Sequence, residues 1–232
     1  VQNTMTWQAL KAYLPSKANY GDCTMLAIVS KAGAQMNSQT TRKINVIGTR
    51  KLPLWDGKAW SDPTVTRNPA WAIADAFRNS TYGRGWADSR LNLAGLLALS
   101  QTWDTRGDTY DGVFDTKVTL WDAVTQIARV GRAMPMYFAG VVEVIRDEPR
   151  AVPTLLLTPH NIIQGSLKID YSFPTYDTPD YVVAEYTNPN TWESQTVDCA
   201  LGGSAKLTPK NVQLTGIIQR EQAFREGMYM IA

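Results

Sequence analysis

Four aspartates fall close together in the middle of the chain: Asp104, Asp108, Asp111 and Asp115. Two carboxyl groups held at a fixed separation can carry out glycoside hydrolysis, one as an acid and the other as a base or nucleophile. A solvated loop rich in Asp and Gly has the same composition. The spacing fits no EF-hand calcium loop, because the acidic residues do not alternate before the glycine and no glutamate closes the run. We expect either a carboxylate site or an ordinary loop here.

The chain has one histidine and two cysteines, which limits nucleophilic and metal chemistry. A Ser-His-Asp or Cys-His site would require His160, whose setting over residues 158–161 is typical of a turn, so a surface or capping role is expected. Cys23 and Cys199 lie far apart in the sequence, fit no zinc spacing and predict reduced, buried thiols. We therefore expect no catalytic residue, no metal and no cofactor, and the chain is not expected to be an enzyme.

Two of the eight tryptophans stand in a segment dense in proline, aspartate and glycine, residues 53–63. This composition predicts a loop or a tight hairpin through Asp56 and Gly57. Trp55 and Trp60 could stack on sugars or anchor a protein partner from such a loop. Other tryptophans fall on predicted helices and are expected in the core: Trp71, Trp103 and Trp121.

The middle of the chain carries the signals of three helices. An asparagine followed by a proline starts the first helix at Asn68, and it should end before Tyr82. Apolar residues with helical spacing predict a second helix over 89–103. The third starts at Thr119, where Asp122 completes a capping-box-like pair, and glycine and proline end it.

Strands are predicted on both sides of this block, at 23–29, 42–48, 140–145, 167–173, 181–186 and 211–218. Apolar and polar residues alternate most regularly over 167–173, as in a strand with one solvated face. The pair Gly202-Gly203 predicts a hairpin turn, and a closing helix is expected from Arg220.

This order of elements predicts an α+β fold, with β-barrel-like or sheet units flanking a central block that contains helices. We expect a β-rich segment over 1–62, an α+β block with three helices over 63–150, and a β-rich segment over 151–232 that ends in a short helix. The first and last segments could share one discontinuous domain.

Composition excludes several classes of protein. The 232 residues are 44 % hydrophobic and 19 % charged, which predicts a folded chain. The net charge of +2 gives no strong field for nucleic acid. The longest relevant apolar run, 133–142, contains Pro135 and is too short to span a bilayer, so no membrane span is expected. Because Val1 is not an initiator methionine, we expect a piece of a longer protein.

Several different short motifs follow one another along the chain. In order they are Asn68-Pro69-Ala70-Trp71 with Asp75, Tyr82-Gly83-Arg84-Gly85, Gly112-Val113-Phe114-Asp115 leading into Trp121-Asp122-Ala123, Arg132-Ala133-Met134-Pro135, Glu185-Tyr186 with Asn188-Pro189 and Trp192, and Gly216 with Arg220, Gln222-Ala223 and Arg225. In this order they resemble the central tail-tip protein of long-tailed phages, called tip attachment or host specificity protein J in lambda-like phages. The resemblance runs from about Asn19 to the C-terminus.

The resemblance implies a structural role without catalytic residues. Such proteins are similar to baseplate hubs, in which a ring of three subunits closes the distal end of the tail tube and encircles the path of the tape-measure protein and DNA. Hub domains combine β-barrel-like and α+β units, and the receptor-binding part usually lies nearer the distal C-terminal end. Where relatives often carry an acidic residue, this chain has Asn188-Pro189-Asn190, which puts only a turn in doubt.

We therefore expect a hub fragment at the virion tail tip, made in the host cytoplasm, whose partners are other tail-tip and tail-tube proteins. The full-length protein is expected to be a homotrimer, and the fragment alone could be a monomer. The alternative is a carbohydrate-binding or carbohydrate-cleaving module that uses the loop of Trp55 and Trp60 and the loop 104–115. A third hypothesis, DNA binding in the lumen, has no support from the net charge.

Overall fold

The computed structural model describes residues 46–153, 155–171, 173 and 178–232. The strand predicted at 23–29, most of the one at 42–48, and Cys23 lie outside the described residues. The chain divides into two compact units after Ile47. The elements below all belong to the second unit, Gly48–Ala232.

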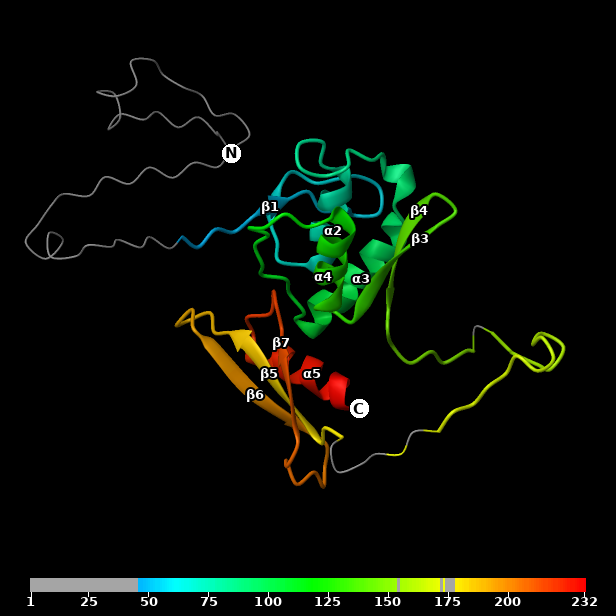
Figure 1. Ribbon diagram of the computed structural model, residues 1–232. Coiled ribbons are helices and arrows are strands. Elements are labelled where there is room, and N and C mark those ends of the chain that lie inside the picture. The colour runs from blue at the N-terminus through cyan, green and yellow to red at the C-terminus, as the bar shows by residue number, and fades with distance from the viewer. Residues whose placement is uncertain (1–45, 154, 172, 174–177) are drawn as a thin grey trace, which may run out of the picture. The chain divides into compact units, whose positions relative to one another are not determined.

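The helices of the described part, labelled in Figure 1, are α2 (Pro69–Arg78), α3 (Leu93–Arg106), α4 (Leu120–Arg129) and α5 (Arg220–Ile231), with a short 3-10 helix η1 (Asp88–Arg90). The strands are β1 (Lys51–Leu52), β2 (Thr64–Val65), β3 (Ala133–Phe138), β4 (Val141–Arg146), β5 (Tyr181–Thr187), β6 (Ser194–Ala200) and β7 (Pro209–Gln213). This content confirms the α+β class.

The strands form three small sheets. β1 pairs with β2, and β3 pairs with β4, both antiparallel. The third sheet has the order β6-β5-β7, in which β5 is antiparallel to β6 and parallel to β7, and α5 packs on it (Figure 1). None of these sheets closes into a barrel, so the barrel-like part of the prediction has no counterpart within the described ranges. The β1–β2 pairing crosses the predicted segment boundary at residue 62.

The helical block is held by caps that the sequence predicts. The Asn68 side chain accepts from the Ala70 backbone N–H at 3.0 Å, and its own amide donates to the Ser100 carbonyl of α3 at 2.9 Å. Thr119 accepts from the Asp122 backbone N–H at 3.1 Å at the start of α4. Asn68 thus both starts α2 and ties it to α3.

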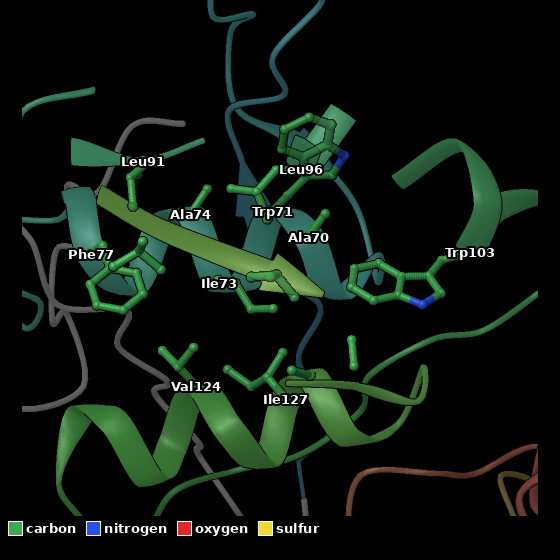
Figure 2. Packing of buried hydrophobic residues seen from close by; sticks show 14 of the residues in the cluster. Ala70, Trp71, Ile73, Ala74, Phe77, Leu91, Leu96, Trp103, Val124 and Ile127 are labelled. Atoms are coloured by element: carbon green, nitrogen blue, oxygen red, sulfur yellow. The ribbon is translucent and has the colours of Figure 1, made fainter. Parts of the chain in front are cut away.

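An apolar core fills the space between α2, α3, α4 and the β3–β4 hairpin. Figure 2 shows Val124 and Ile127 of α4 directed toward Ile73 of α2, with Trp103 at one end of the cluster. Ile73, Val124 and Trp103 are fully buried. Their burial gives this half of the unit its stability, at roughly 1.5–3 kcal/mol for each large side chain.

Two predictions about this block need correction. The helix predicted at 89–103 begins only at Leu93, because η1 and a bridge from Leu91 to Val142 of β4 precede it, and Asn92 caps it through the Gly95 N–H at 2.9 Å. The run 133–138 was expected only to stop a helix at Pro135, yet it forms β3. A proline is tolerated there because β3 is an edge strand.

Two predictions about the last third are also wrong. The regular alternation at 167–173 forms no strand in the described residues: Leu167 and Phe173 are 64 % and 83 % exposed. A turn exists at Gly202 and Gly203, but it is no hairpin, because β6 and β7 lie on opposite sides of β5. The strands at 140–145 and 181–186 and the closing helix are confirmed.

Candidate functional site

The predicted tryptophan hairpin exists. Trp55 and Trp60 form an isolated antiparallel bridge, and their rings lie 5.4 Å apart between centroids. The turn between them is closed by Asp56, whose carboxylate accepts from the backbone N–H groups of Lys58 and Ala59, each at 2.7 Å. These hydrogen bonds, the one from Ala59 foremost, lower the pKa of Asp56. The hairpin predicted through Asp56 and Gly57 is confirmed.

Trp60 is held on three sides. The Arg78 guanidinium lies 3.6 Å from the centroid of the Trp60 ring. The indole Nε1 of Trp60 donates to Asp88 at 2.7 Å, and the rings of Trp60 and Trp71 meet edge-on with centroids 6.1 Å apart. Although desolvation raises the pKa of Asp88, hydrogen bonds from Trp60 and Arg78 outweigh it and the pKa is lowered. Trp60 therefore serves the packing of the block, while contact with a protein or glycan through Trp55 and Trp60 stays a prediction.

The four aspartates do not act as a group. Asp104 lies in the last turn of α3 rather than in a loop, and it accepts from Asn68 at 2.8 Å. Asp111 takes two hydrogen bonds from Arg67, at 2.5 and 2.6 Å. Asp108 is fully buried, whereas Asp115 is exposed. Asp108 and Asp111 are each tied to arginines. The carbohydrate-cleaving alternative stays a prediction.

Asp108 belongs to a buried polar cluster that the sequence did not predict. Its two carboxylate oxygens accept from Arg106 and Arg225, each at 2.6 Å. On the same helix as Arg225, the buried Glu226 pairs with Arg132 at 3.0 Å. We call Asp108, Arg132, Gln222, Arg225 and Glu226 the polar junction, because it joins α5 to the helical block.

Gln222 occupies the centre of the polar junction and is completely buried. Its side-chain amide donates to the carbonyls of Thr109 and Val130 at 3.0 and 3.1 Å, and its oxygen accepts from the Thr109 N–H at 3.2 Å. The side chain thus satisfies backbone groups 92 and 113 residues away in the chain. The available sequence signal was the polar row Gln222, Arg225 and Glu226, which share one face of the closing helix.

Burial governs the titration of Glu226. Desolvation raises the pKa of this carboxyl, against the opposing effect of Arg132, and the charge of Asp108 raises it further. A group whose pKa is raised in the folded state binds its proton more tightly there than in the unfolded chain. Its contribution therefore favours folding below the ordinary pKa of glutamate and is lost as the pH rises through the folded value.

We predict that Glu226→Gln changes the pH dependence of stability. The variant lacks the titrating carboxyl of Glu226. Its free energy of unfolding should therefore increase relative to that of the unmodified chain as the pH is raised from 4 toward 7. Urea denaturation at several pH values measures the difference. A difference that stays constant or moves the opposite way would show that the pKa of Glu226 is not raised by folding. Exposed Glu193 provides the control, since Glu193→Gln should leave the profile unchanged.

The β3–β4 hairpin presents apolar side chains to solvent. Met134, Met136 and Phe138 alternate along β3 and are 62 %, 47 % and 77 % exposed. On β4 the residues facing the core are Val142 and Val144, which are buried. Trp121 was expected in the core but is 39 % exposed on α4, where its ring lies 6.4 Å from that of Phe77 at an interplanar angle of 64°, so that prediction was wrong for this tryptophan.

The remaining candidate groups lie as follows. His160 is exposed in a turn, and Cys199 is buried as a free thiol, as expected. Within the described ranges no cluster of His, Cys, Asp and Glu could hold a metal ion. In the same residues, every helix is too short or too polar to cross a bilayer. No family model matches the chain, and no curated protein matches it in sequence.

Proposed function

We propose that the chain is a structural component of a phage or prophage tail tip, a hub fragment that closes the distal end of the tail tube and connects it to the host-recognition part. Its partners would be other tail-tip and tail-tube proteins. In the full-length protein, three subunits would form a ring around the path of the tape-measure protein and DNA. The proposal has its origin in the order of the motifs along the chain.

The observation that carries the proposal is that the motif residues hold elements of the fold together. Asn68 joins α2 to α3, Arg132 and Gln222 lie in the polar junction, and Gly216 packs on Tyr110. An alanine Cβ at Gly216 would stand 2.5 Å from the Tyr110 ring. The φ of Gly216, +85°, also favours glycine. These residues maintain a framework rather than line a reactive site, which fits a structural part.

Exposed apolar surface also favours a protein that works in an assembly. Monomeric soluble proteins seldom expose large contiguous apolar patches, and such patches mark contacts with other molecules. On β3 three apolar side chains at alternate positions, Met134, Met136 and Phe138, are exposed. Contact with neighbouring tail proteins would remove them from water.

Electron microscopy tests the proposal directly. Antibodies against this chain should label particles induced from a strain that carries its coding sequence, at the end of the tail remote from the head. The same antibodies should detect the full-length protein in purified particles by immunoblot. Particles that contain no such protein, or that are labelled only on the head or along the tail tube, would contradict the proposal.

A further inference from the structure

The connection between β4 and β5 is long and rich in exposed apolar side chains. It runs over 147–180, and its described residues, 147–153, 155–171, 173 and 178–180, form no helix or strand (Figure 1). Its exposed large apolar residues after Pro153, with their exposed fractions, are Leu155 72 %, Leu156 79 %, Leu157 63 %, Ile163 80 %, Leu167 64 %, Ile169 62 %, Tyr171 79 % and Phe173 83 %. Connections of this length within a compact domain are uncommon and are usually functional or unstructured.

The size of this surface suits a stable interface. Each of these side chains offers on the order of 100 Å² or more to a partner, so together they approach the ~800 Å² that one side of a standard protein interface buries. Covering them would contribute about 25 cal/mol per Å² before the costs of association. The chain thus carries enough unburied apolar surface in one segment to hold a partner.

The pattern within the segment says how the partner would bind. Leu167, Ile169, Tyr171 and Phe173, which we call the apolar row, recur at every second residue, and the ammonium of Lys168 pairs with the carboxylate of Asp170 at 3.0 Å. In an extended chain this spacing places the apolar row on one face and the polar residues on the other. This pattern is typical of a strand in a sheet, yet none of the described strands pairs with the segment.

The third sheet offers an open edge for such a strand. β6 has a hydrogen-bonded neighbour, β5, on one side only, and its seven residues contain no proline. β7 is shorter and begins with Pro209, and β3 contains Pro135, so both of these edges are poorer acceptors. β4 has no proline, but Leu91 bridges to Val142 and the Asn92 N–H donates to the Val142 carbonyl, so part of that edge is already occupied. Among the strands of five or more residues in the described part of the chain, β6 is therefore the best acceptor edge.

Helix α5 leaves apolar surface beside that edge. Phe224 is exposed on the flank of α5, whereas Met228 and Ile231 of the same helix are half-buried against the core of the third sheet. The thiol of Cys199 on β6 donates to the Phe224 carbonyl at 3.5 Å, which places this part of the helix next to β6. Phe224 is 41 % exposed. A strand added to β6 would cover it.

We infer that the apolar row of one copy of this chain adds as a strand to the β6 edge of a second copy, with its apolar side against the flank of α5. The inference rests on the proposed hub function, for which it supplies the contact between copies. Donor and acceptor surfaces differ, so the contact is head-to-tail, the type of contact that forms a ring where its rotation closes.

Mixing two defective variants tests the inference. Ile169→Asp removes the donor and Phe224→Asp removes the acceptor, and both positions are partly exposed, so each variant should remain folded by circular dichroism. In light scattering the unmodified chain should gain mass with concentration above 25.8 kDa. Each variant alone should remain a monomer. An equimolar mixture should form a one-to-one heterodimer, because one chain keeps the donor and the other keeps the acceptor.

One control variant and three contrary outcomes complete the test. Lys168→Ser lies on the polar side of the same segment and should associate as the unmodified chain does. The inference fails if the unmodified chain is a monomer at every concentration, if Ile169→Asp associates normally, or if the mixture contains no heterodimer. Labelling of the tail tip is measured separately, so failure here leaves the hub proposal to be judged on that result.

Discussion

Replacing Asp108 by asparagine should lower the free energy of unfolding by about 3 kcal/mol, the scale expected when one partner of a buried ion pair is removed. The side chain of Asp108 is completely buried between the guanidinium groups of Arg106 and Arg225, both at 2.6 Å. Asparagine has nearly the same shape but no charge, so two arginines would face each other without compensation. Urea denaturation followed by tryptophan fluorescence measures the loss.

Asp115→Asn is the matched control for Asp108→Asn, because Asp115 lies in the same stretch of chain and is exposed. It should change the free energy of unfolding by less than about 0.5 kcal/mol. Equal effects of the two substitutions would contradict a structural role for Asp108. The result also bears on the carbohydrate alternative, since a loss of glycan binding in Asp108→Asn means little if the variant is unfolded.

Gly131→Ala should have an effect of similar size, about 3 kcal/mol, at the upper end of the range for overpacking a core. An alanine Cβ would stand 2.0 Å from Nε1 and 2.5 Å from Cε2 of Trp103. The indole cannot move aside easily, because Trp103 is completely buried and donates to the Gly131 carbonyl at 3.1 Å. Separating the two would therefore break this hydrogen bond as well.

Gly202→Ala isolates the steric effect at Gly131, because a Cβ at Gly202 would meet no atom within 4 Å. Its midpoint of urea denaturation should match that of the unmodified chain. The Gly131→Ala variant should unfold at lower urea concentration, and its tryptophan emission in buffer should shift as Trp103 loses its partner. A Gly131→Ala variant as stable as the Gly202→Ala variant would show that the packing around Trp103 is looser than described.

The features that could be predicted from sequence are those that depend on neighbouring residues. The caps at Asn68 and Thr119 and the turn at Asp56 each satisfy backbone N–H groups two or three residues further along the chain. Such contacts form wherever the local sequence allows them. For this reason the starts of α2 and α4 and the tryptophan hairpin agree with the prediction.

Two wrong predictions, at 133–138 and 167–173, have the same cause. Each considered one segment without the strand that would or would not pair with it. Pro135 indicated the end of a helix, but an antiparallel partner, β4, holds residues 133–138 extended. The apolar row around Ile169 has the alternation of a strand, but the described residues offer it no partner. Strand formation depends on what lies alongside as much as on the segment itself.

The sequence by itself determined the class of the fold and the caps and turns that start its elements. Only the tertiary structure decided which charged residues are buried and with whom. Arg225 meets Asp108 across 117 positions of the chain, and Gln222 reaches Thr109 across 113. Pairings at that separation depend on how α5 docks, and docking is set by the packing of the whole unit, which no short stretch of sequence encodes.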